Sequence, residues 1–140
     1  SYSLLTEFTE GGFQEVIDDP MISDAAKVKR VLLCSGKVYF DLSEKQITEN
    51  REDIAIIRME QIYPLPTQQL QKVYEKYKSA QWLWVQEEPR NMGAASFLKM
   101  NLTGINLGYL TRQASASTAT GFAKKHAEEQ KMLVDEAFSI

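Results

Sequence analysis

Hydrophobic positions along this chain alternate between continuous runs and runs at helical spacing. Continuous apolar blocks predict buried strands near residues 31–34, 53–59 and 82–85, and a weaker block predicts a fourth at 107–110. After each of these strands, mostly apolar residues recur at helical spacing and predict one face of a helix. The four faces are Val38, Tyr39 and Leu42; Leu70, Val73, Tyr74 and Tyr77; Ala94, Phe97 and Leu98; and Ala123, Ala127, Gln130, Val134 and Ala137. Strands alternating with helices predict an α/β fold, a three-layer α/β/α sandwich with a mostly parallel sheet and right-handed crossovers.

The first 26 residues lack this regular pattern, because a glycine pair and an Asp-Asp-Pro run interrupt it. Their apolar side chains can still pack onto a core, and these are Phe8, Phe13, Val16 and Ile17. We therefore divide the chain into an ordered amino-terminal arm, residues 1–26, with one short helical turn, and a carboxy-terminal α/β domain, residues 27–140. Regular structure is expected to begin at about Lys27.

Composition places the chain among ordinary soluble domains, with 140 residues, 44% hydrophobic content and 25% charged residues. The single cysteine, Cys34, cannot form an internal disulfide and gives no sign of an oxidising compartment. A net charge of -3 with scattered basic residues disfavours nucleic acid as a partner. The sequence also lacks a long apolar run and a signal-peptide pattern. We expect a soluble intracellular protein with no membrane contact.

Sequence motifs for catalysis and cofactor binding are missing. Neither the dinucleotide fingerprint nor the P-loop occurs. The single histidine, His126, and the lone Cys34 are too few to assemble a transition-metal site, and no recognisable nucleophile motif accompanies His126. We therefore predict no catalytic residue, no cofactor site and no metal site in this chain.

Two loops nevertheless have features of an anion-binding site. Ser35-Gly36-Lys37 follows the first strand, where backbone amides and an ammonium group can meet a negative charge; a plain turn with a solvated lysine is the favoured alternative. The second loop runs from Arg112 through Ser115 and Ser117 to Lys125 at a helix start. Its hydroxyls suit either a phosphate or carboxylate, or a helix that caps itself.

The segment QEEPRNMGA, residues 86–94, joins the third strand to the next helix, where open α/β sheets usually carry their working loops. Glu87 and Glu88 would point to opposite sides if the strand continued, which argues against a catalytic carboxylate pair. Their pairing with Arg90 and a binding role remain alternatives. Asn91 is the expected N-cap of the helix.

Four segments in this order, LLCSGKVYFDL, DIAIIRMEQIYPLP, QWLWVQEEPRNMGA and RQASASTATGFAKKHAEEQ, give the whole chain a family resemblance. The chain resembles the carboxy-terminal domain of the decarboxylase component of 2-oxoglutarate dehydrogenase, which is similar to transketolases. The upstream FTEGGFQEVIDD resembles the stretch that enters this domain. Gln113 stands where many relatives carry proline, which loosens the expected rigidity of that loop.

The resemblance implies membership in a larger enzyme. Such an enzyme decarboxylates 2-oxoglutarate with thiamin diphosphate and magnesium and passes the succinyl group to a lipoyl arm of a dihydrolipoyl succinyltransferase. The cofactors and catalytic residues belong to the preceding domains, so this chain alone is predicted to be inactive. The resemblance also adds an antiparallel edge strand, a homodimer partner and contacts with the preceding domains of the same chain. Localisation would be cytoplasmic in a bacterium and the mitochondrial matrix in a eukaryote.

In some members this domain also borders a pocket for nucleotide-like effectors. Residues near strand ends and in loops are the candidates for an effector or domain-contact surface: Lys37, Arg58, Glu87, Arg90, Arg112, Ser115 and Ser117. Two alternatives stay open, a free-standing anion-binding α/β module and the same domain of a 2-oxoadipate dehydrogenase.

Overall fold

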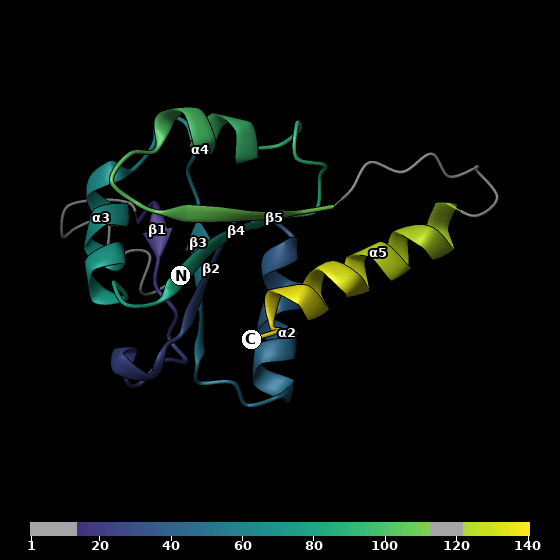
Figure 1. Cartoon of the computed structure of the whole chain (residues 1–140), viewed down its shortest axis with the longest axis horizontal. Coiled ribbons are helices and arrows are strands. Elements are labelled where there is room, and N and C mark those ends of the chain that lie inside the picture. Colours follow the sequence, from purple (N-terminus) through teal and green to yellow (C-terminus); the bar gives the residue numbers. More distant parts are fainter. Residues whose placement is uncertain (1–13, 113–121) are drawn as a thin grey trace.

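The computed structural model describes residues 14–112 and 122–140, which form a five-stranded sheet flanked by helices (Figure 1). The strands are β1 (Val16–Ile17), β2 (Arg30–Cys34), β3 (Ile54–Met59), β4 (Gln81–Gln86) and β5 (Leu107–Thr111). The helices are η1 (Ala25–Lys27), α2 (Val38–Thr48), α3 (Thr67–Lys76), α4 (Ala95–Asn101) and α5 (Phe122–Ala137). The strand order is β1-β3-β2-β4-β5, with β1 antiparallel to β3 and the other pairs parallel.

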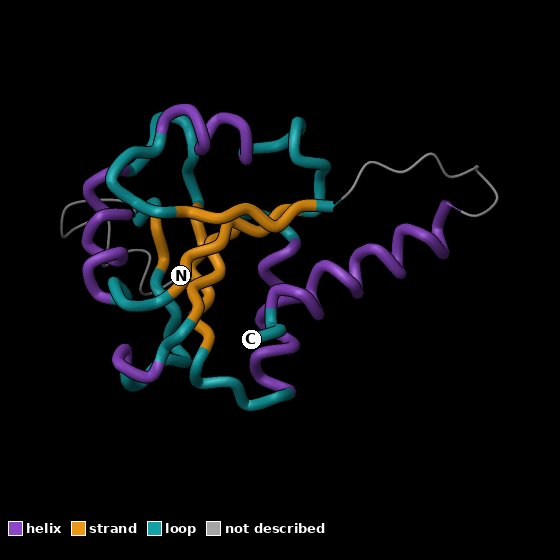
Figure 2. Tube along the Cα trace, viewed as in Figure 1, coloured by secondary structure: helices purple, strands orange, loops and turns teal. Residues whose placement is uncertain are grey.

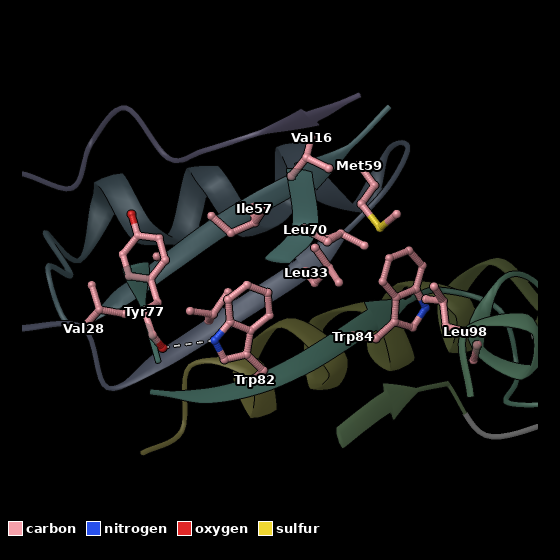
Figure 3. Packing of buried hydrophobic residues seen from close by; sticks show 13 residues of the cluster. Val16, Val28, Leu33, Ile57, Met59, Leu70, Tyr77, Trp82, Trp84 and Leu98 are labelled. Carbon is pink, nitrogen blue, oxygen red and sulfur yellow. Dashed lines mark hydrogen bonds between the residues drawn. The ribbon is translucent and has the colours of Figure 1, made fainter. Parts of the chain in front are cut away.

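Helices lie on both faces of this sheet (Figure 2), and a separate hydrophobic core lies on each face. On one face, α3 and α4 contribute Leu70, Tyr77 and Leu98 to a core that includes Trp82 and Trp84. Figure 3 shows this core, in which Trp82 Nε1 donates a hydrogen bond to the carbonyl of Tyr77 at 3.2 Å. The other face is covered by side chains of α2 and α5, namely Val38, Leu42, Leu133, Val134, Ala137 and Phe138. The predicted three-layer sandwich is therefore confirmed.

The four parallel strands lie where the sequence predicted them. The central strands are covered on both faces; in β3, for example, residues 54–57 are all buried, whereas the weaker block became the half-buried strand β5. The antiparallel edge strand implied by the family resemblance is also present, as β1. Among the described residues, no helix is long and apolar enough to span a membrane.

Three predictions of detail were wrong. Within the described residues, regular structure is already present at Val16, before the predicted start at Lys27, because β1 pairs with Arg58 and Met59 of β3 and joins the sheet. Asn91 does not cap α4, whose N-cap position is Ala94. Ala123 and Ala127 are exposed, because α5 packs on the sheet only through its carboxy-terminal half.

Buried and half-buried acids fasten the arm to the sheet. The Asp19 carboxylate is 5% exposed and accepts hydrogen bonds from Gln46 Nε2 of α2 at 2.7 Å and from the Ile56 amide of β3 at 2.8 Å. Asp18 accepts a hydrogen bond from the Tyr77 hydroxyl at 2.8 Å. Burial, and then the bond to Asp18, raise the pKa of Tyr77. The predicted packing of the arm is thus confirmed for Val16, which is buried, whereas Phe8 and Phe13 lie outside the described residues.

Candidate functional site

Four of the predicted site residues lie at the carboxyl ends of the parallel strands, here called the carboxyl edge. Parallel strands end at a common edge, so the segments that follow β2, β3, β4 and β5 are neighbours there. Lys37 follows β2, Arg58 is the penultimate residue of β3, and Arg112 follows β5. Glu87 follows β4 in the same way. The carboxyl edge is therefore the candidate functional site.

Arg58 combines a cation with two aromatic rings at this edge. Its guanidinium lies 4.7 Å from the ring centroid of Tyr39 and 5.6 Å from that of Phe40, both at the start of α2. The Arg58 Nε atom is 2.9 Å from Glu60 Oε2, an ion-pair contact whose angles do not make a hydrogen bond. The Phe40 ring is 61% exposed. This part of the edge thus presents a flat apolar surface beside a guanidinium group.

The Ser35-Gly36-Lys37 turn leaves its lysine in solvent. Gly36 has a φ of 77°, which favours glycine, and Lys37 is exposed at the N-cap position of α2 without a side-chain capping bond. Cys34, next to this turn, is buried, and its burial raises the thiol pKa to about 12 although the Arg58 charge opposes the rise. The thiol is therefore kept protonated, while Lys37 can contact a ligand.

Gln86 organises the QEEPRNMGA loop from inside. Its buried side-chain oxygen accepts hydrogen bonds from Trp84 Nε1 and from the Ala95 amide, both at 2.9 Å. Its amide nitrogen donates to three loop carbonyls, those of Glu88 at 3.2 Å, Pro89 at 2.8 Å and Met92 at 2.7 Å. A side chain from the preceding strand therefore binds the first amide of α4, in place of the local cap predicted at Asn91.

The same loop presents its charged residues outward. Gly93 has a φ of 65°, and a Cβ atom there would lie 3.1 Å from Gln86 Oε1, so glycine is needed for both conformation and space. Glu87 is half-buried, while Glu88 and Arg90 are exposed. Within the described residues, no ion pair joins either glutamate to Arg90. The proposed structural pairing is thus wrong.

Arg112 connects three elements. Its guanidinium contacts His126 Nδ1 at 2.6 Å and donates a hydrogen bond to Gln130 Oε1, both on α5. Gln130 Nε2 in turn donates to Asp41 Oδ2 of α2 at 2.7 Å. Arg112 is therefore engaged within the protein. Ser115 and Ser117 of the following loop, and with them the predicted anion site or self-capped helix start, lie outside the described residues.

A groove of about 990 Å³ is lined by two of the candidate residues and not by the other three that the structure describes. It lies between α4, β5 and α5, and both Arg90 and Arg112 line it, whereas Lys37, Arg58 and Glu87 do not. Lys99 of α4 and Glu128, Glu129 and Glu136 of α5 also line it. Sequence reasoning missed these residues, because only the fold brings α4 and α5 to the two sides of β5.

In the part of the chain that the structure describes, no group of three or more His, Cys, Asp or Glu residues is placed to hold a metal ion. Sequence reasoning also missed the Tyr39–Phe40 ring pair, whose signal was two adjacent aromatic residues directly after the Lys37 turn. The fold and the edge loops define a doubly wound α/β domain with its polar residues at the carboxyl edge.

Comparison with known proteins identifies the family. The family described as 2-oxoglutarate dehydrogenase C-terminal matches residues 2–138, and the chain belongs to it. The chain is 43% identical to the 2-oxoglutarate dehydrogenase E1 component of Haemophilus influenzae, over 99% of this chain and 15% of that protein. It is 41% identical to the oxoglutarate dehydrogenase of Buchnera aphidicola, over 99% of this chain and 16% of that protein.

A third relative is the 2-oxoglutarate dehydrogenase E1/E2 component of Corynebacterium glutamicum, to which the chain is 42% identical over 95% of its own length and 11% of the relative. The chain therefore spans between 11% and 16% of the length of these relatives. The family resemblance read from the four sequence segments is confirmed.

Proposed function

We propose that the chain acts as the carboxy-terminal domain of a longer 2-oxoglutarate dehydrogenase that decarboxylates 2-oxoglutarate and transfers the succinyl group to a lipoyl arm. The observation that carries this proposal is the match over nearly the whole chain to relatives named as E1 components. Thiamin diphosphate and magnesium would bind in the part of the polypeptide that precedes this domain. The present residues would serve contacts and regulation.

Within that enzyme, the carboxyl edge would contribute to homodimer contacts and bind a nucleotide-like effector. Two features support the effector role. Arg58 and Lys37 supply positive charge for a phosphate group, since cations form strong charge-assisted hydrogen bonds with phosphate oxygens. The exposed Phe40 ring, beside the Arg58 guanidinium, offers a surface on which a planar base can stack.

The first experiment examines the natural protein. An antibody raised against this chain is used to blot a lysate of the source cell and to capture the protein for assay. We expect a band on the order of 100 kDa, as several domains require, and turnover of 2-oxoglutarate that depends on thiamin diphosphate and magnesium. Turnover of 2-oxoadipate alone would assign the chain to a 2-oxoadipate dehydrogenase. A band near 16.0 kDa without turnover would indicate a free-standing anion-binding module.

The second experiment tests the effector role in the full-length enzyme. Lys37→Glu and Arg58→Glu replace a cation by an anion, and each should raise the nucleotide concentration needed for half-maximal activation by about tenfold. Lys72→Glu, at an exposed lysine of α3, is the matched control and should leave activation unchanged. A panel of nucleoside monophosphates, diphosphates and triphosphates serves as the probe. Unchanged activation in both edge variants would refute the effector role.

A further inference from the structure

Within the part of the chain that the structure describes, strand β5 forms one edge of the sheet. Within the described residues it pairs only with β4, and its five residues carry no charged side chain. All five are half-buried, so its outer side is partly accessible. The groove of about 990 Å³ runs beside this edge, and Figure 1 shows β5 between α4 and α5. An edge strand inside a groove is a template on which another extended chain can pair.

The two walls of the groove lie on opposite faces of the sheet. Tyr109 packs with the core under α3 and α4, whereas Leu110 packs with the core under α2 and α5. Successive residues of β5 therefore mark the two faces, as the pleat of a strand requires. A strand added beside β5 would likewise send alternate side chains toward α4 and toward α5.

The charges of the two walls are opposite. On the α4 side, the charged residues that line the groove are Arg90 and Lys99, both basic. On the α5 side, the lining contains Glu128, Glu129 and Glu136. The basic residues of that side, Arg112 and Lys125, lie where β5 ends and α5 begins, and Arg112 is already bound to His126 and Gln130. Along most of the groove, a basic wall thus faces an acidic wall.

We propose that this groove, here called the β5 groove, binds an extended segment of a partner polypeptide whose acidic and basic side chains alternate. The segment would pair with the outer backbone of β5. Its acidic side chains would meet Arg90 and Lys99, and its basic side chains would meet Glu128, Glu129 and Glu136. This site is distinct from Lys37 and Arg58, and it does not depend on the effector role of those residues.

Charge disfavours a second copy of the chain as the occupant. Two antiparallel β5 strands related by a two-fold axis would keep α4 of both copies on the same face of the joined sheet. Arg90 and Lys99 would then meet their own counterparts, and the α5 glutamates would do the same. Like charges placed opposite each other across strands are destabilising. A segment of different sequence avoids this repulsion.

The test uses the full-length protein that contains this chain and a short fluorescent peptide of the length of β5, in which glutamate and lysine alternate. Fluorescence anisotropy measures its binding. A peptide of the same composition with the glutamates grouped at one end should bind at least about fivefold more weakly, because it cannot satisfy both walls. A peptide methylated at alternate backbone nitrogens, on the pairing side, should not bind, because it cannot form the ladder.

Two charge reversals assign the walls. A peptide that alternates glutamate with threonine should bind the Lys99→Glu variant about threefold more weakly than the unsubstituted protein. Its affinity for the Glu128→Lys variant should equal that for the unsubstituted protein. A peptide that alternates lysine with threonine should show the reverse dependence. Lys72→Glu, outside the groove, should change neither affinity. This crossed pattern separates contact with two opposite walls from a general effect of net charge.

Hydrogen exchange at the β5 amides tests whether the edge is accessible before the peptide is added. In the full-length protein without peptide, outward amides of β5 should exchange fast, and the alternating peptide should slow them. Three results would overturn the proposal: no binding of the alternating peptide, equal binding of the grouped peptide, or slow exchange before any peptide is added. The last result would mean that a second copy or the rest of the same polypeptide already covers the edge, and sedimentation equilibrium would tell these two apart.

Discussion

At the β1 edge of the sheet, side chains cover the backbone, whereas at the β5 edge the backbone borders an open groove. Gln69 Oε1 accepts hydrogen bonds from the amides of Glu15 and Val16, both at 3.0 Å, and Asp19 binds the neighbouring β3 and α2. At β5, helices α4 and α5 form walls of opposite charge instead. In the described part of the chain, the β1 edge is thus bound by side-chain hydrogen bonds, whereas the β5 edge borders the groove that we propose as a binding site.

The two edges differ in whether their polar side chains are buried against the backbone or exposed to solvent. A charged acceptor buried among backbone amides strengthens a fold, since each bond to it is charge-assisted. A charged side chain on the rim of a groove adds little to folding, because it stays in water in both states. Substitutions at the β1 edge should therefore cost stability, while those in the groove should change binding alone.

The largest loss is expected from Asp19→Ala at the β1 edge. The substitution leaves the Ile56 amide without its acceptor and takes from the buried Gln46 amide one of its two acceptors, and should lower the free energy of unfolding by about 4 kcal/mol. Urea unfolding followed by tryptophan fluorescence measures this. Glu52→Ala, at an exposed acid, is the control and should have little effect. A loss as small as that of the control would show that Asp19 does not fasten the arm.

A smaller loss is expected from Gln86→Glu, at the end of β4, whose side chain organises the QEEPRNMGA loop. The new carboxylate would keep the acceptor for Trp84 and Ala95 but would face three carbonyl oxygens, costing about 3 kcal/mol at neutral pH. Protonation of the carboxyl group at low pH should recover part of the loss. Gln68→Glu, at an exposed position of α3, is the control for urea unfolding. Equal stability of the two variants would refute the organising role of Gln86.

Gln69→Ala should cost about 1.5 kcal/mol, because one neutral acceptor is lost from two partly buried backbone amides. Hydrogen exchange should quicken at Glu15 and Val16 and stay unchanged at β5. The neighbouring Gln68→Ala removes an exposed side chain and should leave exchange at the β1 edge as it was. Unaltered exchange in the Gln69 variant would mean that its side chain does not protect this edge.

The smallest effect is expected from Lys99→Glu. Its side chain is on the rim of the β5 groove, so the thermal unfolding temperature should match that of Lys72→Glu and the free energy should change by no more than about 0.5 kcal/mol. A large loss of stability would show that Lys99 supports the fold. The contrast between the two edges would then disappear.

Some of the fold was predictable because it depends on local patterns. Residues 54–57 are apolar without interruption, and such a run has few solutions other than a strand buried on both faces. Strand β1 was not predictable in this way, since two residues carry no periodicity and their place is set by pairing with β3. The cap of α4 was missed for a similar reason, because its acceptor is Gln86 in the preceding strand rather than a local side chain.

The residues of the candidate site were likewise predictable from the sequence only in part. Lys37, Arg58, Glu87 and Arg112 were found from the sequence, because strand ends can be read from the chain and parallel strands end together. The β5 groove was not found, because its lining comes from α4, β5 and α5, and no local pattern brings Lys99 and Glu128 into one groove.

The alternation of strands and helices, the mostly parallel sheet and the family follow from the residues alone, since these depend on periodicity and on segments read in order. The folded chain was needed to learn which edge of the sheet is bound by side chains, which side chain organises the QEEPRNMGA loop and which charges line the two sides of β5. These features depend on contacts between residues that are distant along the chain. Hydrogen bonds and charge pairs join residues that are far apart in sequence, and folding alone brings them together.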